Sequence, residues 1–168
     1  MIKQCGTNGG GKISSAPSTS GIATSPISIR INLKRNRVRA GTLIKGQAII
    51  TNRSNMPVTV QQCAADGWLL VGLANERIQF DPAVSLVACA PSIKLLPGKN
   101  RFPIKVMTTY QECLQPGGQS LIYVPPCVNG NQLPSLPSGT YQTKVVTYGL
   151  PTGTPAPASV MVKVAAKA

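Results

Sequence analysis

The residues best suited to chemistry in this chain are its five cysteines, because the sequence has no histidine and only four acidic residues. Without histidine, neither a Ser-His-Asp triad nor a Cys-His nucleophile pair can form. Two of the acids, Asp66 and Asp81, stand in turn contexts, where aspartate is common for local reasons. No local signature supports a Ser-Lys dyad. We therefore predict that the protein is not an enzyme and uses no metal or cofactor.

Four cysteines form an even set within one strand-rich region, which predicts two disulfides and a location outside the cytoplasm. Four cysteines allow three pairings. We favour the sequential pairing, because the second loop would then contain its own turn at Pro116-Gly117-Gly118. Metal binding or redox catalysis is the alternative, but the set contains no C-x-x-C spacing. The four residues are Cys63, Cys89, Cys113 and Cys127.

The fifth cysteine, Cys5, stands apart, ahead of a stretch rich in Gly, Ser, Thr and Pro. Residues 1–26 bury too little apolar surface to offset their ordering entropy, so we expect a disordered tether. Cys5 is a candidate lipid anchor on such a tether, and the alternative is an ordinary free thiol. No signal-peptide hydrophobic segment precedes it, so an exported protein would have this sequence as its mature form. No apolar stretch approaches the roughly 18 residues of a transmembrane helix.

Positive charge dominates the chain, with a net charge of +13. Such a charge attracts lipid head groups, acidic cell-wall polymers, nucleic acid or acidic proteins, or it simply keeps a basic secreted protein soluble. Five cations within ten residues are the candidate patch for an anionic surface. The alternative is a solvated edge strand, where charge blocks unwanted pairing. Nucleic acid is not the expected partner, because stacking aromatics are absent from this stretch. The patch consists of Arg30, Lys34, Arg35, Arg37 and Arg39.

The elements that must position these residues are predicted to be strands. Apolar and polar residues alternate from Ile27 to Leu33, which indicates a half-buried strand. Three arginines then continue the inward parity, and burying them would cost too much, so we expect a turn or bulge near Arg35-Asn36. Trp68 is predicted to lie in or near the core. Further strands are predicted over residues 43–51, 58–63, 68–71, 93–96, 102–106, 121–124, 139–148 and 160–164.

Turn signals separate these strands. Pro97-Gly98 predicts a hairpin, and Pro116-Gly117-Gly118 predicts a smaller one that returns through 121–124. Residues 74–92 are the least regular, and we expect loops with one short strand there. We count about eight strands, and no segment has a helical period. This pattern is typical of an all-β sandwich, with a small closed barrel as the alternative. The long loops 72–92 and 108–138 are where a partner is expected to bind.

Three segments carry a resemblance: Gly46–Asn52 continuing through Pro57–Val60, Leu95–Phe102, and Leu136–Tyr141. In this order they resemble the immunoglobulin-like domains of secreted proteins and lipoproteins in actinobacteria. The resemblance covers roughly residues 27–165 and implies a tether at 1–26 and an immunoglobulin-like β-sandwich domain at 27–168. It also implies that Tyr141 is a corner tyrosine whose hydroxyl bonds to backbone. Ile2-Lys3-Gln4 before Cys5 departs from the small residue that bacterial lipoproteins carry there.

Most such domains have no assigned activity, and they tend to be cell-envelope adhesion, scaffold or binding modules. The expected function is therefore a non-catalytic, exported binding or scaffold module of the bacterial cell envelope. Its partner would be an envelope protein or an anionic cell-surface polymer, and it would reach a membrane only through the lipid anchor. The alternative is an inhibitor of secreted hydrolases or proteases that presents a loop held by Cys113 and Cys127.

Overall fold

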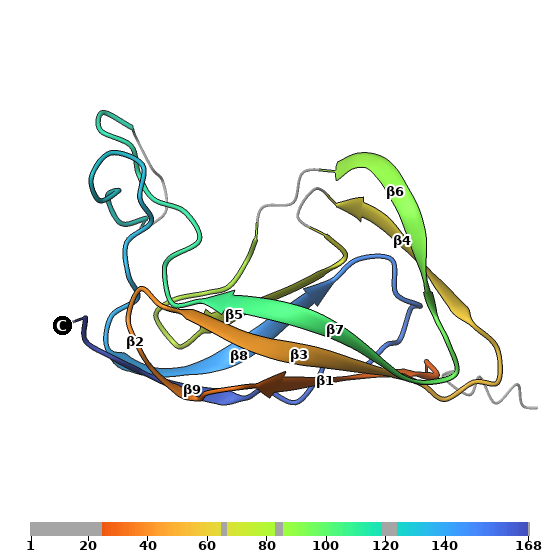
Figure 1. Ribbon diagram of the computed structural model, residues 1–168. Helices are drawn as coiled ribbons and strands as arrows, with labels where there is room; N and C mark the ends of the chain where they lie inside the picture. The colour runs from red at the N-terminus through yellow and green to blue at the C-terminus, as the bar shows by residue number, and fades with distance from the viewer. Residues whose placement is uncertain (1–24, 65–66, 83–85, 119–123, 168) are drawn as a thin grey trace, which may run out of the picture.

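The computed structural model describes residues 25–64, 67–82, 86–118 and 124–167, and these residues form an all-β domain without a helix (Figure 1). For residues 63–64 and 86–91 it describes the backbone alone. The predicted tether 1–26 lies almost entirely outside the described residues. The strands are β1 (Ile27–Leu33), β2 (Arg37–Arg39), β3 (Leu43–Asn52), β4 (Val58–Ala64), β5 (Leu69–Ala74), β6 (Leu86–Leu95), β7 (Gly98–Met107), β8 (Gly139–Thr147) and β9 (Met161–Ala165).

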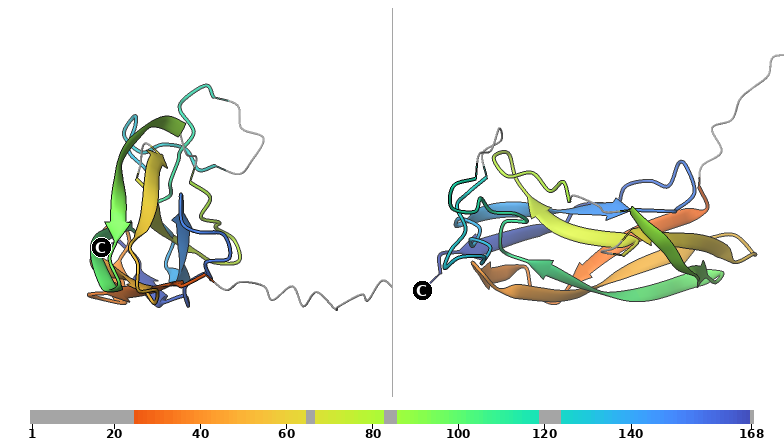
Figure 2. Two further views of the ribbon diagram at one scale, coloured as in Figure 1. Left: turned by 90° about the vertical axis from the view of Figure 1, so that its right-hand side faces the viewer. Right: turned by 90° about the horizontal axis from the view of Figure 1, so that it is seen from above.

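The nine described strands form three sheets. One has the order β1-β3-β7 and is antiparallel throughout. The second has the order β2-β9-β8-β5, in which only the β2–β9 pair is parallel. The third is the antiparallel pair β4–β6. Figures 1 and 2 show β3 and β7 running along the length of the domain, while the far ends of β4 and β6 rise away from the two larger sheets.

A single hydrophobic core joins the sheets. Alternate residues of β1, β3 and β7 are buried on one side, and alternate residues of β8 and β9 are buried on the other, as period-two strands with one apolar face require. Trp68, immediately before β5, is 6% exposed and meets Phe102 of β7 edge to face, with ring centroids 5.1 Å apart. The prediction that Trp68 belongs to the core is confirmed.

The predicted turn after the first strand is also confirmed. β1 ends at Leu33, residues 34–36 are a bend, and β2 begins at Arg37 as a separate three-residue strand. Arg35, Arg37 and Arg39 are all exposed, and only Val38 between the last two packs against the core. The cost of burying guanidinium groups explains why the chain leaves the sheet of β1 at this point.

Two predictions about the middle of the chain differ from the structure. Within 74–92, residues 75–82 are loop as predicted, but the one predicted short strand is the start of the ten-residue strand β6. Pro91 lies within β6, because a two-stranded sheet tolerates proline at an edge. The register of β4 against β6 shifts after Val60 and again after Gln62. Pro97-Gly98 does form a tight turn, with Gly98 at φ 91°, but it does not close a hairpin: β6 pairs with β4, and β7 pairs with β3.

The strand β7 ends the three-stranded sheet, and it carries Pro103 at its middle. Proline has no N–H for a ladder, so this position fits an edge strand. The smaller predicted hairpin cannot be compared, since residues 119–123 of its return strand lie outside the described residues.

The hydroxyl of Tyr141 on β8 bonds to backbone, as the family resemblance implies. Tyr141 is 1% exposed, and its hydroxyl donates to the carbonyl oxygen of Pro137 at 2.8 Å. Burial raises the pKa of the Tyr141 hydroxyl above the ordinary 10.0; the nearby Tyr110 acts in the same direction, and a side-chain hydrogen bond with Asn75 lowers it. The residue is therefore structural, and it is held in the neutral form.

We expect Tyr141→Phe to lower the free energy of unfolding at neutral pH by about 1 kcal/mol, the contribution of one hydrogen bond. Because the folded pKa is raised, the stability that Tyr141 contributes is complete below the unfolded pKa and is lost as the pH rises through the folded pKa. Urea unfolding from neutral pH to above pH 10 measures this effect. The wild type should approach Tyr141→Phe at the alkaline end, and a constant difference at every pH would contradict the prediction.

Candidate anion-binding groove

Residues 34–36, the crossing segment, connect β1 to β2 and so carry the chain from one sheet to the other beside the site. At its start, the N–H of Lys34 donates to the carbonyl oxygen of Lys45 on β3 at 3.0 Å. At its end, the N–H of Lys163 on β9 donates to the carbonyl oxygen of Asn36 at 2.7 Å. The parallel register then places Arg37 beside Lys163. The basic residues of 34–39 are thereby fixed next to Lys45 and next to Lys163, which is remote in sequence.

Beside this crossing lies a groove of about 770 Å³. Six of its lining residues are cations, and all six are exposed to solvent. Between them lie the aliphatic side chains of Val38 and Leu43, and no acidic residue lines the groove. The cations are Lys34, Arg35, Arg37, Arg39, Lys45 and Lys163.

The acidic residues that the structure describes lie elsewhere. The described carboxylates are Glu76 and Asp81, which lie in the loop after β5, and Glu112, which lies in the loop after β7. The two loops touch, because the side-chain amide of Gln111 donates to the carbonyl oxygen of Gln79 at 3.4 Å. Within the described ranges no carboxylate forms an ion pair with a groove cation. Clustered like charges without local neutralisation create a potential that concentrates anions.

Thr108, fully buried at the end of β7, holds one wall of the groove. Its hydroxyl accepts a hydrogen bond from the N–H of Thr42 at 2.7 Å. The same hydroxyl donates to the carbonyl oxygen of Thr42 at 2.9 Å, and the carbonyl oxygen of Arg39 is a second acceptor at 3.2 Å. Its backbone carbonyl accepts from the N–H of Gly41 at 3.0 Å. The turn between β2 and β3 is thus fixed from inside the core.

We expect Thr108→Val to lower the free energy of unfolding by about 1–2 kcal/mol, because it leaves the Thr42 amide without its acceptor. It should also weaken binding of anions in the groove, since the turn that carries Arg39 and Thr42 loses its internal support. Thr108→Ser keeps the hydroxyl and is the control. Chemical denaturation and titration with a soluble polyanion measure the two effects. Equal polyanion affinity in Thr108→Val and wild type would contradict the positioning role.

The structure brings together four of the five predicted patch residues. Arg30 does not line the groove. It lies on the outer face of β1, four residues before Lys34. Sequence reasoning missed Lys45 and Lys163. The exposed parity of Lys45 in an alternating strand was a usable signal, but nothing local to Lys163 indicates that β9 lies beside β2. That parallel pair joins opposite ends of the chain.

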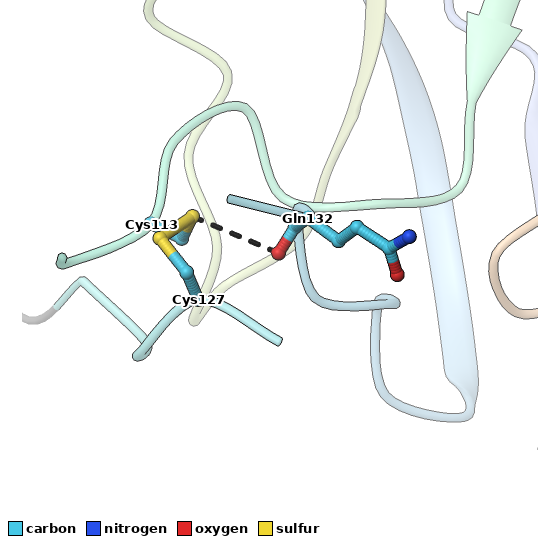
Figure 3. The surroundings of a disulfide bond; sticks show 3 residues. All are labelled: Cys113, Cys127 and Gln132. Atoms are coloured by element: carbon cyan, nitrogen blue, oxygen red, sulfur yellow. Dashed lines mark hydrogen bonds between the residues drawn. A yellow bond between two sulfur atoms is a disulfide. The ribbon is translucent and has the colours of Figure 1, made fainter. Parts of the chain in front are cut away.

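The predicted disulfide Cys113–Cys127 is confirmed, with Cα atoms 4.8 Å apart. It ties Leu114 and Pro126 into a bridge, and the Cys113 sulfur lies 3.7 Å from the carbonyl oxygen of Gln132 (Figure 3). Val128 and Gln132 pair around Asn129 and Gly130, both at positive φ, to form a tight reversal. Figures 1 and 2 show this loop at the same end of the domain as the C-terminus.

The remaining cysteines lie outside the residues whose side chains are described. Cys63 follows Gln62 on β4, and Cys89 precedes Ala90 on β6, and Gln62 pairs with Ala90. With Cys113 and Cys127 already joined, this backbone register favours Cys63–Cys89 as the second disulfide. It stays a prediction, which non-reduced peptide mapping would check: a peptide carrying free Cys63 would contradict it. Cys5, the candidate lipid anchor, also lies outside the described ranges.

Among the described residues, no three His, Cys, Asp or Glu side chains gather where they could hold a metal ion. In the same part of the chain, no helix is long and apolar enough to cross a bilayer. No known protein-family model matches the chain, and comparison with curated proteins gives no match.

Proposed function

We propose that this protein is an exported, non-catalytic binding module of the bacterial cell envelope with an immunoglobulin-like sandwich fold. Its groove holds a linear anionic polymer of the cell surface through Lys34, Arg35, Arg37, Arg39, Lys45 and Lys163. The single observation that carries this proposal is the collection of six cations, without a lining carboxylate, in one groove.

The immunoglobulin-like part of the proposal is supported by the arrangement of the two larger sheets around one core and by two marker residues. Tyr141 bonds to backbone four residues upstream, as the corner tyrosine of such domains does. Trp68 is buried immediately before β5, a strand of the same sheet as β8, which carries Tyr141. Two residues after the corner tyrosine, where antibody domains have cysteine, this chain has the buried Thr143. The resemblance to actinobacterial secreted proteins and lipoproteins is part of the proposal.

The location outside the cytoplasm is supported by Cys113–Cys127, because disulfides persist in oxidising compartments. A lipid on Cys5 would keep the domain at the membrane from which the polymer extends. No residue of the proposed mechanism performs chemistry: the protein docks, and its charge holds it near the envelope.

A linear polymer suits this groove better than a single small anion does. The cations come from the crossing segment, β2, β3 and β9, and are therefore distributed over several elements around the groove. Three are arginines, whose planar guanidinium groups bind phosphate or carboxylate oxygens in pairs. Val38 and Leu43 offer apolar contact to the backbone of the polymer between its charges.

Isothermal titration with two soluble polyanions, one carrying phosphodiesters and one carrying carboxylates, tests the proposal. We expect binding that weakens steadily as the salt concentration rises, because exposed ion pairs are screened. Affinity that is unchanged at high salt, or an absence of binding to either polymer at low salt, would refute the electrostatic mechanism.

An inhibitor of secreted proteases is the second candidate, and the loop closed by Cys113–Cys127 favours it. The enclosed segment 114–126 would have to enter a protease cleft in extended form, and residues 119–123 within it lie outside the described residues. A panel of secreted proteases assayed with micromolar protein discriminates the two functions, since a surface-binding module inhibits none of them.

A further inference from the structure

The outer face of the β1-β3-β7 sheet is a second basic surface that continues from the groove. The registers place outward-facing residues of the three strands in successive rows. Arg30, Ile49 and Arg101 form one row, and Lys45 and Lys105 stand opposite each other in another. All of these cations are exposed, and no acidic residue occurs in β1, β3 or β7. The basic face consists of Arg30, Lys34, Lys45, Lys99, Arg101 and Lys105.

Exposed apolar side chains flank the basic face at both ends. Leu43 pairs with Met107 beyond the Lys45–Lys105 row, and they are 41% and 49% exposed. Leu96, 58% exposed, lies in the turn from which β7 starts, next to the row that contains Lys99. From Lys99 to Met107 the strand spans about 26 Å. The face is therefore a strip of cations with apolar side chains where it begins and ends.

This arrangement has a cost for the free protein. Like charges directly opposite on neighbouring strands destabilise a sheet, and Lys45 faces Lys105 without a described carboxylate near either. Large exposed apolar side chains add no stability either. A partner that supplies a plane of negative charge and an apolar layer beneath it would relieve both costs.

We propose that the basic face docks on the surface of an anionic phospholipid bilayer. The ammonium and guanidinium groups of the face bind phosphate oxygens, while Leu43 and Met107 enter the interfacial layer, as apolar side chains of peripheral membrane proteins do. A soluble polymer in the groove contacts Leu43 but offers no apolar layer to Met107 and Leu96, so it leaves these two side chains exposed. Four cations of the face do not line the groove, so the inference stands apart from the proposed polymer site.

Co-sedimentation of the full chain, prepared without lipid on Cys5, with phospholipid vesicles tests the proposal. One vesicle type is pure phosphatidylcholine, and the other contains equal parts of phosphatidylcholine and phosphatidylglycerol. The test variant is Lys99→Gln/Arg101→Gln/Lys105→Gln. A charge-matched control, Arg77→Gln/Lys94→Gln/Lys144→Gln, removes three exposed cations from other surfaces. All substitutions are at exposed positions, and circular dichroism verifies folding.

We expect the wild type and the control to bind the anionic vesicles and not the neutral ones. The face variant should bind on the order of 100-fold more weakly, since each basic residue near an anionic membrane contributes about a fivefold factor. Equal vesicle binding by the face variant and the control would overturn the proposal. The same variant should keep its affinity for soluble polyanions, because that affinity depends on the groove. A variant that loses only vesicle binding affects the basic face, and one that loses only polymer binding affects the groove, so the two proposals are tested separately.

A fluorescent reporter distinguishes docking on lipid from capture of charge alone. Met107→Trp places an indole at the end of the face, and the buried Trp68 gives a constant background. We expect a blue shift and enhanced emission with anionic vesicles and no shift with a soluble polyanion. An unchanged emission maximum in the presence of bound vesicles would overturn entry of Met107 into the bilayer interface.

Discussion

Reversing the charge of the three groove arginines, Arg35→Glu/Arg37→Glu/Arg39→Glu, should weaken binding of an anionic polymer on the order of 100-fold or more at low salt. Each exposed ion pair contributes up to about 1 kcal/mol, and each introduced repulsion costs a similar amount. Three lost attractions and three added repulsions together account for a change of this size. Because all three side chains are exposed, the free energy of unfolding should change little.

Isothermal titration with the same two polyanions measures the effect, and the matched control reverses Arg77, Lys94 and Lys144. The control carries the same net charge but leaves the groove intact. If long-range attraction to the whole protein were responsible for binding, both variants would lose affinity equally. That outcome would remove the groove from the proposed function.

The largest expected effect on stability comes from Trp68→Ala. The indole is buried between the sheets and meets Phe102 edge to face. Its removal forfeits apolar burial, leaves a cavity and breaks the aromatic pair, which together cost about 3–5 kcal/mol. Single domains are stable by only about 5–15 kcal/mol, so the variant should be close to unfolding at physiological temperature.

Because Trp68 is the only tryptophan, urea unfolding of this variant must be followed by circular dichroism. Trp68→Phe keeps most of the apolar volume and should lose less stability than Trp68→Ala. Met56→Ala, at a residue that is 68% exposed, is the surface control and should change the midpoint little. An equal midpoint for Trp68→Ala and Met56→Ala would show that the two sheets do not depend on this contact.

The elements whose signals are local could be predicted from the sequence. The alternation from Ile27 to Leu33, the arginines on the wrong parity after it, and Trp68 in the core each follow from burial costs of the residues concerned. The corner tyrosine Tyr141 was expected from family resemblance, and its hydroxyl does bond to Pro137. In each case one short segment contains all the information that its structure requires.

What could not be predicted depends on pairing between distant segments. The strand β6 contains Ala90-Pro91, a local break signal that pairing with β4 overrides. Pro97-Gly98 specifies a turn, but packing in the core decides which strands pair. The two strands that flank this turn, β6 and β7, therefore pair with different strands. For the same reason the candidate patch lacked Lys163, because the parallel β2–β9 pair brings it to the groove and no local pattern points to that pair.

The free edge at β7 has a consequence for a protein concentrated at a surface. Molecules held on an envelope meet one another at high local density. There an unpaired edge strand can pair with the edge strand of another copy and start aggregation. Here that edge carries Pro103 at its middle and Lys99, Arg101 and Lys105 along it. The proline removes a ladder donor, and facing lysines repel an approaching copy. The β7 edge is thus poorly suited to pairing with a neighbouring copy, and crowding should not drive aggregation through it.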